Sequence, residues 1–391
     1  MNKLQTAVIV IPTYNEAENI GKMIEYLNEK TFPKIENDSA GWRMEILVVD
    51  GNSPDGTGKV VEKLSQKYKN THLLTETSKD GIGAAYLKGF RYAIDKLKAD
   101  FVFEFDADFQ HPPETIPVML KAMEEGYDYV IGSRKIKGGS NPKGWGFKRV
   151  FFSEVGGFVA RFMMFFPFKN FFRVTDPTTG LKVTRVKGFI DKMNLDWKDG
   201  HLLTKSFGYK LQLLFETLKM GAKFKEIPLQ FHVRDAGESK IEAKTAKDIF
   251  RVAFLLRWYD EFTQKFLKFG TVGFIGYLVN ASTLALFSNS LGIVWLSWLL
   301  STEIAIISNF TLNNLWTFKS TNIKGSQLFS KFLQFNFTSL GALAIQTIAG
   351  SIGEYLIGSE YQQILLPFII LFLVMPYNWF IYNNVIWKKK K

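Results

Sequence analysis

Four long apolar stretches occupy the last third of this 391-residue chain and limit what it can fold into. Each has about 20 residues with few charges, which is the length of helix that crosses the hydrocarbon core of a membrane. Residues 1–240 instead mix charged residues, Gly, Pro and short apolar runs, as a soluble domain does. We therefore expect a soluble domain over 1–240 and an all-α domain with four transmembrane helices over 265–391. The four stretches are 269–290, 294–316, 332–353 and 363–386.

Basic residues beside these stretches predict how the helices are oriented. The loop 319–331 and the chain end at 388–391 are rich in Lys, whereas the loops near 290–294 and at 354–362 contain no Lys or Arg. Because basic loops stay on the cytoplasmic side, we expect both termini and the soluble domain to be cytoplasmic. The sequence therefore predicts an integral membrane protein with four spans.

The net charge of +12 fits a membrane surface and phosphate ligands better than it fits nucleic acid. The basic residues cluster around apolar segments, and the sequence contains no nucleic-acid-binding motif. The absence of Cys excludes disulfides and thiolate metal sites, and four scattered His residues argue against a His-based zinc site. We expect a lipid bilayer as a partner, and no nucleic acid.

The first 240 residues alternate short apolar runs with helically spaced segments. This alternation predicts an α/β domain with a mostly parallel, Rossmann-like sheet and helices on both faces. Ligands bind such sheets beyond the carboxyl ends of the strands, where Asp50 and Asp106 stand. The predicted strands are 7–11, 45–50, 72–75 and 101–105, and the predicted helices are 16–30, 57–68 and 84–97.

Asp106 and Asp108 directly follow the apolar run 101–105. In extended chain, residues at i and i+2 place their side chains on the same side. Two carboxylates in that position can hold a divalent cation against a diphosphate, and Mg²⁺ or Mn²⁺ prefers such oxygen ligands. Gln110 repeats the spacing and can add its carbonyl oxygen. The pattern predicts a metal site that supports the leaving group of a nucleotide sugar.

Two aromatic, basic segments predict contact with the membrane interface. In residues 146–174, many Phe residues are interleaved with Lys and Arg. Residues 241–264 repeat the pattern, with Phe254 and Trp258 set against Arg251. We expect an interfacial amphipathic segment within the soluble domain and a separate interface helix after it. A core helix is the alternative reading of the first segment.

Several motifs occur in the order seen in polyprenyl-phosphate sugar synthases, and the chain resembles that family over about residues 5–245. The motifs are Ile11-Pro-Thr-Tyr-Asn-Glu16, Val49-Asp50 with Ser53-Pro-Asp-Gly-Thr57, Asp106–Glu114, Ile131-Gly-Ser-Arg134 and Gly237-Glu-Ser-Lys240. The family consists of inverting, family 2 glycosyltransferases with a GT-A fold. The resemblance is strongest to the dolichol-phosphate mannose synthases. Residues 265–391 resemble the GtrA-type membrane domain that is fused to some of these synthases.

The resemblance implies a role for each group of residues. The nucleotide sugar would be bound by Pro12, Tyr14, Glu16, Val49, Asp50, Asp106, Ala107, Asp108, Gln110, Arg234 and Lys240. The metal ligands would be Asp106, Asp108 and Gln110, and these residues would also be catalytic. The acceptor's phosphate would be received by Arg134, Arg149 and Ser153, which would also be catalytic. The implied activity is metal-dependent transfer of mannose from GDP-mannose to dolichyl or another polyprenyl phosphate, at the cytoplasmic face of the membrane.

One departure from the family leaves the nucleotide open. The family often has a second acid directly after Asp50, and this chain has Gly51. The alternative activity is glucose transfer from UDP-glucose to a polyprenyl phosphate. A glycolipid flippase is a rival from another class, but the spans carry no charged pathway beyond Glu303. A processive polysaccharide synthase is disfavoured because Arg257-Trp258 lacks the Gln that precedes this pair in that class.

Several further residues have two readings each. Asp176-Pro-Thr-Thr-Gly180 resembles a family turn near the site, or is a plain turn. Lys210 and Glu216 either face the donor or pack within their helix. Glu303 either orients a lipid phosphate or makes an interhelical hydrogen bond, with Asn280 and Asn309 as candidate partners. His111 is expected to shape the loop around the acidic pair.

Overall fold

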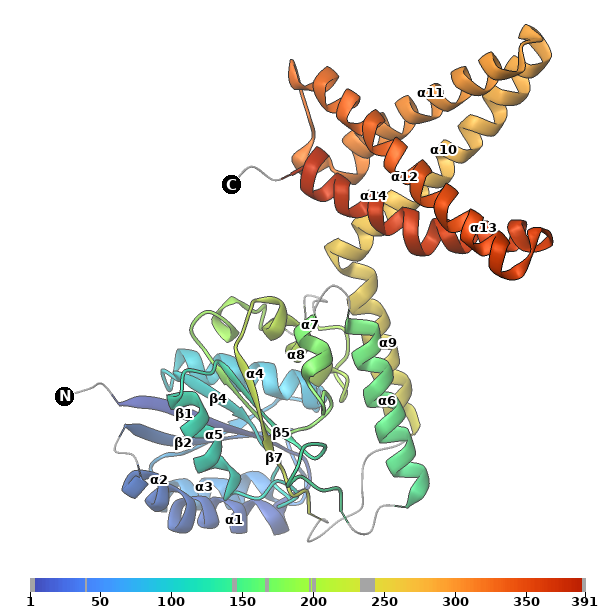
Figure 1. The fold of residues 1–391 in the computed structure, drawn as a ribbon. Helices are drawn as coiled ribbons and strands as arrows, with labels where there is room; N and C mark the ends of the chain where they lie inside the picture. Colours follow the sequence, from blue (N-terminus) through green and yellow to red (C-terminus); the bar gives the residue numbers. More distant parts are fainter. Residues whose placement is uncertain are drawn as a thin grey trace. The chain divides into compact units, whose positions relative to one another are not determined.

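The computed structural model describes residues 4–38, 41–142, 146–165, 169–196, 198, 202–232 and 243–388. The chain divides into two compact units, Met1–Trp258 and Tyr259–Lys391. The first unit is an α/β domain and the second is entirely helical (Figure 1). The predicted combination of an α/β domain with a mostly parallel sheet and a helical domain is confirmed.

A seven-stranded sheet with the order β3-β2-β1-β4-β6-β5-β7 forms the centre of the first unit. Every strand pair is parallel except those of β6, which runs antiparallel to β4 and β5. The predicted strands correspond to β1 to β4, whereas β5 to β7 were not predicted. The strands are β1 (Gln5–Thr13), β2 (Trp42–Asp50), β3 (Thr71–Thr75), β4 (Phe101–Glu104), β5 (Tyr129–Ser133), β6 (Lys182–Arg185) and β7 (Phe224–Pro228).

Helices cover both faces of the sheet, because successive strand residues point to opposite faces. Ile9 of β1 packs into a core with α1 (Ala17–Tyr26), α2 (Phe32–Asp38), α3 (Thr57–Lys67) and α5 (Thr115–Glu124). Val8 and Val10 pack on the other face with α4 (Ile82–Asp95) and α8 (Tyr209–Lys219). The single helix predicted over 16–30 is instead α1, a π-helical segment Leu27–Thr31, and then α2.

Two aromatic helices lie side by side and pack against residues of β5 (Figure 1). They are α6 (Phe147–Phe165), followed by the short α7 (Lys169–Arg173), and α9 (Ala243–Tyr259). Their inner faces bury Ala160, Met164, Val252 and Leu256 in one hydrophobic cluster with α8. Their other faces expose the aromatic residues Phe147, Phe151, Phe158, Phe162, Phe250, Phe254 and Trp258. Each helix is therefore amphipathic, and α9 packs as part of the first unit.

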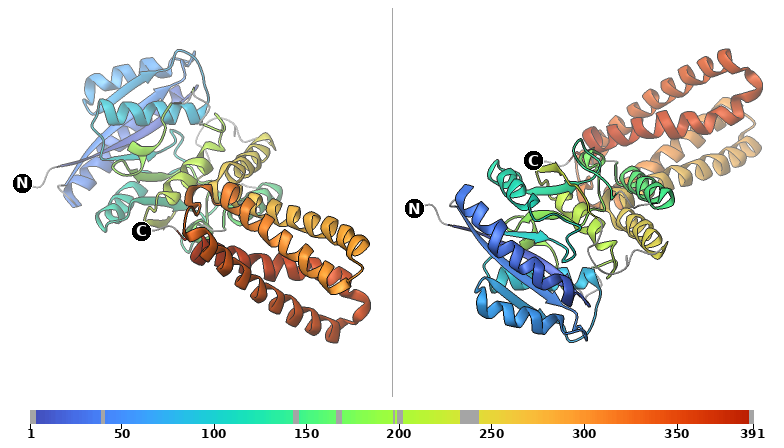
Figure 2. Two further views of the ribbon diagram at one scale, coloured as in Figure 1. Left: turned by 90° about the horizontal axis from the view of Figure 1, so that it is seen from above. Right: turned by 90° about the horizontal axis from the view of Figure 1, so that it is seen from below.

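The second unit consists of two helical hairpins (Figure 2). One is α10 (Glu261–Leu291) with α11 (Val294–Leu312), and the other is α12 (Gln327–Ile357) with α13 (Gln362–Ile369) and α14 (Met375–Ile381). Within the described part of the chain, three helical segments are long and apolar enough to cross a membrane: Glu261–Leu291, Gln327–Ile357 and Ile364–Ile386. The helix α11 was predicted as a further span; its polar residues Glu303 and Asn309 lower its hydropathy, and a total of four spans stays a prediction.

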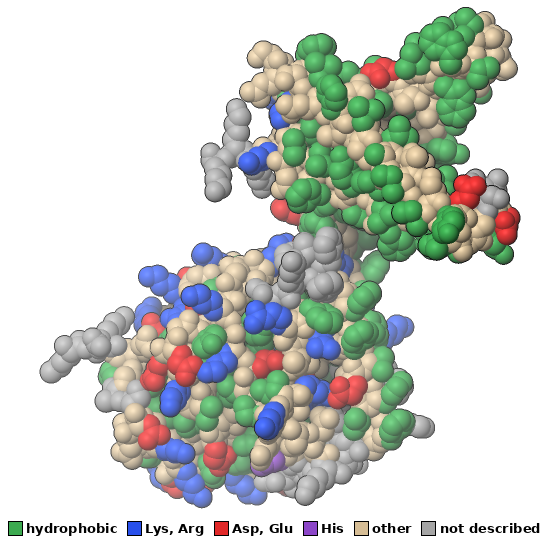
Figure 3. Space-filling model, in the orientation of Figure 1, with side chains coloured by type: hydrophobic (Ala, Val, Ile, Leu, Met, Phe, Trp, Pro, Cys, Tyr) green, Lys and Arg blue, Asp and Glu red, His purple; other side chains and the backbone are tan. Residues whose placement is uncertain are grey.

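The surfaces of the two units differ in composition. On the face drawn in Figure 3, hydrophobic side chains cover most of the helical unit, whereas Lys, Arg, Asp and Glu are spread over the α/β unit. Inside the helical unit, aromatic rings pack together, and the Phe318 and Trp387 rings stack 4.5 Å apart. Glu303 of α11 accepts a hydrogen bond from Asn336 of α12 at 2.8 Å. Its interhelical partner is therefore Asn336, rather than Asn280 or Asn309.

Candidate active site

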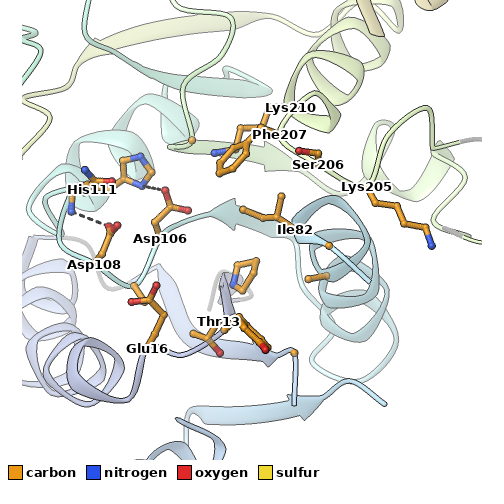
Figure 4. Close-up of a pocket in the computed structure, with 18 of the residues that line it drawn as sticks. Thr13, Glu16, Ile82, Asp106, Asp108, His111, Lys205, Ser206, Phe207 and Lys210 are labelled. Carbon is orange, nitrogen blue, oxygen red and sulfur yellow. Dashed lines mark hydrogen bonds and ion pairs between the residues drawn. The ribbon is translucent and has the colours of Figure 1, made fainter. Parts of the chain in front are cut away.

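A cavity of about 590 Å³ opens at the carboxyl ends of the central strands (Figure 4). Its walls come from the residues that follow β1 and β4, from the start of α4, and from α8. Of the residues predicted to form the site, those that line it are Pro12, Tyr14, Glu16, Asp106, Ala107, Asp108, Gln110 and Arg134. The fold therefore brings together motifs that lie more than a hundred residues apart in the sequence.

The acidic pair lies at the centre of this cavity, directly after β4. Figure 4 shows Asp106 between Lys210 on one side and Glu16 on the other. The Asp106 side chain is 26% exposed, whereas Asp108 is buried and accepts a 3.2 Å hydrogen bond from the backbone N–H of Gln110. Phe109, which directly follows Asp108, has a φ of 59°, a backbone conformation that is rare for a bulky residue. The loop is therefore held in one tight geometry around the carboxylates.

The donor set suits a hard divalent cation. Among the described residues, no group of three or more His, Asp or Glu side chains is arranged to hold a metal ion. Mg²⁺ commonly takes only one or two carboxylates from the protein and completes its shell with substrate phosphates and water. Asp106, Asp108 and the Gln110 carbonyl supply hard oxygen ligands of that type. The residues present therefore fit a cation that a diphosphate would share.

His111 and Lys210 lie buried beside the acidic pair. The Nδ1 atom of His111 is 3.6 Å from Oδ2 of Asp106, and burial lowers the pKa of His111 to about 4. Neither ring nitrogen of His111 has a hydrogen-bond partner in the described structure. A Cβ atom added at Gly180 would lie 2.6 Å from Nζ of Lys210 and 2.7 Å from Cε1 of His111. Gly180 therefore allows both side chains to reach the cavity, and Asp176–Gly180 is more than a plain turn.

Arg134 also lines the cavity, and a buried acid anchors it. Its Nε and Nη2 atoms each donate a 2.7 Å hydrogen bond to Asp176, and its backbone N–H donates another to the same carboxylate. Burial acts to raise the pKa of Asp176. The contacts with Arg134 lower it by more, so the pKa lies below its ordinary value. Glu226 in turn accepts hydrogen bonds from the backbone N–H groups of Thr175 and Asp176. This chain of contacts orients the guanidinium before any ligand binds.

Asp50 and Val49 are buried, and their predicted role in nucleotide binding stays a prediction. Asp50 is buried and accepts hydrogen bonds from the Thr13 hydroxyl at 3.0 Å and from the Ser53 hydroxyl and N–H at 2.6 and 2.9 Å. Val49 points into the hydrophobic core with α4. Neither residue is among the described residues that line the cavity. Asp50 therefore ties the loop after β2 to the end of β1.

Tyr14 and Lys79 form one wall of the cavity near Asp50. The Lys79 ammonium lies 3.6 Å from the centre of the Tyr14 ring, which is a close cation–π contact. Glu76 and Asp80 line the same corner, and both carboxylates bind Lys88, at 2.6 and 2.7 Å. This group of charges was not predicted from the sequence. The Gly-bearing loop at 76–81 was the sequence feature that could have indicated it.

The remaining predicted residues are not among the described residues that line the cavity. Ser153 is half-buried on α6 and is not among the residues that line the cavity. Arg149 stands on the same helix, but its side chain is outside the described structure, as are Arg234, Gly237 and Lys240 altogether. Glu216 accepts a hydrogen bond from Gln212 one turn earlier on α8, and so is engaged within its own helix. The roles expected of these residues stay predictions.

A layer of buried polar residues packs next to the acidic pair, and it was not predicted from the sequence. Glu104 at the end of β4 faces Lys182 of the antiparallel strand β6 and accepts a 2.9 Å hydrogen bond from the Tyr209 hydroxyl. Burial lowers the pKa of Lys182 to about 8 and raises that of Glu104. Lys182 donates to the backbone carbonyl of Lys210 at 3.1 Å. These contacts fix the start of α8, and with it Lys210, relative to β4.

Comparisons with known proteins agree with this arrangement. Residues 8–194 match Glycosyl transferase family 2, and residues 268–387 match the GtrA/DPMS transmembrane domain. A dolichol-phosphate mannosyltransferase of Pyrococcus furiosus is 34% identical over 344 residues, which are 87% of this chain and 88% of that protein. An undecaprenyl-phosphate mannosyltransferase of Micrococcus luteus is 32% identical over 253 residues, or 64% of this chain and 94% of the relative.

Solved structures show more distant similarity. The mannosyl-3-phosphoglycerate synthase of Rubrobacter xylanophilus is 18% identical, and the match covers 65% of this chain and 74% of that one with a TM-score of 0.45. The family assignment therefore follows from the sequence relatives, and it confirms the resemblance inferred from the motifs. The chain belongs to glycosyl transferase family 2, and its catalytic domain is followed by a GtrA/DPMS transmembrane domain.

Proposed function

We propose that this glycosyltransferase moves mannose from GDP-mannose to dolichyl or another polyprenyl phosphate. The proposal follows the names of the relatives above, which are dolichol-phosphate and undecaprenyl-phosphate mannosyltransferases. One observation in the structure carries it. The acidic pair Asp106 and Asp108 shares a single cavity with the cationic side chains of Arg134 and Lys210. The reaction needs both groups, because it transfers the sugar from a donor whose diphosphate is held through a cation to the oxygen of an anionic acceptor phosphate.

The acceptor's chemistry determines what the residues must do. A phosphate monoester has a second pKa of about 6, so its oxygen is already ionised at neutral pH and needs no strong general base. The protein must instead bring two anionic groups together and align them, and such positioning is a large part of catalysis. Attack in line with the departing diphosphate inverts the α-linked donor, giving a β-linked mannosyl phosphate. Asp106 and Asp108 therefore act through the diphosphate rather than as bases.

Each half of the cavity has a part in this scheme. Asp106, Asp108 and Gln110 would hold Mg²⁺ or Mn²⁺, which when bound neutralises charge that develops on the leaving diphosphate. Arg134, oriented by Asp176, offers a planar guanidinium to the acceptor's phosphate oxygens. Lys210 adds a second buried cation on the same side. Arg149 and Ser153 on α6 are proposed to complete the acceptor site, and Arg234 and Lys240 to close over the donor.

The acceptor is a lipid, so the site must lie close to a membrane surface. We propose that residues 1–240 form a cytoplasmic domain whose segment 146–174 touches the interface. Residues 241–264 would lie in the interface as a helix, and residues 265–391 would cross the bilayer four times with both termini cytoplasmic. The exposed aromatic faces of α6 and α9 support the interfacial part of this arrangement. The basic loop 319–331 supports the orientation.

Transfer from radiolabelled donors to short-chain dolichyl phosphate tests the proposal. We expect product from GDP-mannose with Mg²⁺ or Mn²⁺, little or none with EDTA, and little or none from UDP-glucose. Product from UDP-glucose alone would overturn the mannose assignment while keeping the glycosyltransferase family. Equal rates with and without EDTA would overturn the metal assignment. An anomer-specific mannosidase applied to the purified lipid product checks the β linkage.

A further inference from the structure

The loop after β2 begins with a glycine that lines the cavity. Gly51 follows Asp50, and a Cβ atom added at Gly51 would lie 3.3 Å from Cδ2 of Tyr14 and 3.6 Å from Oε2 of Glu76. A side chain at position 51 would therefore enter the cavity corner formed by Tyr14, Lys79 and Glu76. This corner is next to the carboxylate of Glu76, the residue that directly follows β3.

The backbone and Lys88 hold Glu76 in place. Its N–H donates a 2.8 Å hydrogen bond to the carbonyl of Asp50, which extends the pairing of β2 and β3 by one residue. Its side chain is 3% exposed, and Oε1 accepts a 2.6 Å hydrogen bond from Lys88. Burial raises the pKa of Glu76, and the Lys88 ammonium opposes that rise. With Oε1 bound to Lys88, Oε2 is the oxygen on the side of Gly51.

Asp50 is poorly placed to contact a nucleobase. Three donors, from Thr13 and Ser53, already surround its carboxylate, and it is not among the described residues that line the cavity. Glu76 does line it, beside the Tyr14 ring. A buried carboxylate at a cavity corner of this kind recognises paired N–H donors, because charged acceptors form the stronger hydrogen bonds.

We propose that Glu76 reads the base of the donor nucleotide as guanine; this rests on the proposed use of GDP-mannose. Guanine presents two adjacent donors, N1–H and the 2-amino group, to a carboxylate. Uracil presents one N–H between two carbonyl oxygens, which a carboxylate would repel. Glu76 therefore favours GDP over UDP, and Tyr14 and Lys79 flank the base.

Binding of nucleoside diphosphates to the full chain in detergent, measured by calorimetry with Mg²⁺, tests this assignment. Inosine diphosphate (IDP) is the sharpest probe, because it differs from GDP only in lacking the 2-amino group. Loss of one hydrogen bond to a charged group costs about 10-fold or more in affinity, so wild-type protein should prefer GDP to IDP by that factor. In Glu76→Gln, Lys88 would keep its hydrogen bond to the side-chain oxygen at position 76, and the new NH₂ group would face the base. We expect GDP affinity to fall about 10- to 100-fold, and the preference over IDP to disappear.

Three further variants separate base recognition from a structural effect. Asp95→Asn changes an exposed acid on α4 that is not among the described residues lining the cavity, and should leave the GDP-to-IDP preference unchanged. Glu76→Ala combined with Gly51→Asp returns an acid from the neighbouring position, and should restore the preference. Gly51→Asp alone places a second carboxylate beside Glu76, and should weaken GDP binding. The sign of the Gly51→Asp effect thus reverses with the residue at position 76.

Failure of this inference differs from failure of the proposed function. If wild-type protein binds UDP more tightly than GDP, the GDP-mannose assignment falls and Glu76 cannot be reading guanine. If wild-type protein binds GDP but Glu76→Gln weakens GDP, IDP and UDP equally, the inference alone is overturned, because Glu76 then only supports the loop. Unchanged GDP binding in Glu76→Gln overturns it as well. Thermal melting of each variant confirms that the comparison is made between folded proteins.

Discussion

The two units of this chain differ in how their carboxylates are held. In the α/β unit, the buried carboxylates of Asp50 and Asp176 each accept at least three hydrogen bonds. In the helical unit, the half-buried carboxylate of Glu303 accepts one described hydrogen bond, from Asn336. Buried polar atoms without a described hydrogen-bond partner occur in both units, for example on His111 and on Asn313.

This difference indicates which polar groups must be held in a fixed position. Polar groups that must hold a reacting geometry need to be fixed before substrate binds, and the α/β unit surrounds its charges with donors accordingly. The polar contacts described between spans are few, as expected for helices whose outer surface is apolar. We therefore expect variants of the first unit to change chemistry and stability strongly, and variants of the second to change them weakly.

The largest effect is expected from the acidic pair. Asp108→Ala removes a proposed ligand of the diphosphate-bound cation, whose charge stabilisation amounts to several kcal/mol. Turnover should fall about a thousandfold, because each 1.4 kcal/mol is about a tenfold change in rate. Transfer from GDP-mannose at saturating donor is the measurement. Asp95→Ala, an exposed acid on α4 outside the cavity, is the matched control. Near-normal turnover of Asp108→Ala would contradict the metal assignment.

The buried Arg134–Asp176 pair gives the next largest effect, on stability. Asp176→Asn removes the carboxylate that two guanidinium nitrogens of Arg134 contact, and breaking such a buried pair costs about 3–5 kcal/mol of unfolding free energy. Thermal and urea unfolding of the full chain in detergent would measure the loss. The exposed pair of Lys225 and Glu125 provides a control, because Glu125→Gln should cost less than about 1 kcal/mol. Similar losses in both variants would show that burial does not distinguish the pairs.

The same pair predicts a pH dependence. The pKa of folded Asp176 is held below its ordinary value of 3.8, so the carboxylate's contribution is present above that pH and is lost as pH falls through the lower folded pKa. The difference in unfolding free energy between wild type and Asp176→Asn should therefore be constant at neutral pH and shrink below about pH 4. Unfolding at several pH values checks this. A difference that persists unchanged in acid would argue that Asp176 acts through packing alone.

Removal of the helical unit gives an intermediate effect, because every described cavity residue belongs to the first unit. A chain that ends at Asp260 should still transfer mannose to a short-chain acceptor in detergent. With a long-chain acceptor in vesicles, losing the attachment to the bilayer should lower the rate about 100-fold. The full chain assayed with both acceptors is the control. Complete loss on the short-chain acceptor, with the truncated protein folded, would place part of the chemistry in the helical unit.

The smallest effect is expected inside the helical unit. Glu303→Gln keeps a group that can accept from Asn336, and hydrogen bonds between membrane helices contribute about 0.6 kcal/mol on average. We expect a stability change below about 1 kcal/mol and unchanged transfer to either acceptor. Thermal melting and the transfer assay measure the two. A large loss of transfer with normal stability would give Glu303 a direct role with the lipid phosphate and weaken the contrast between the units.

Residues whose role depends on near neighbours were predicted well. Asp106 and Asp108 were recognised because an apolar run and its following loop are adjacent in sequence, and both line the cavity. The amphipathic character of 146–174 was likewise visible from spacing, and α6 exposes one aromatic face. Strand β6 was missed because three of its four residues, Lys182, Thr184 and Arg185, are polar, although Lys182 and Thr184 are buried in the sheet.

The sequence by itself determined the division into a mixed, soluble-type part and an apolar part. It also determined the parallel α/β pattern, the acidic loop after β4 and the apolar helices. Those features depend on periodicity and on residues a few positions apart. Only the tertiary structure decided that Asp176 anchors Arg134, that Thr13 and Ser53 enclose Asp50, and that Glu76 lies beside Gly51. These partners come from different strands and loops. Their contact depends on the order of strands in the sheet, which short-range patterns do not encode.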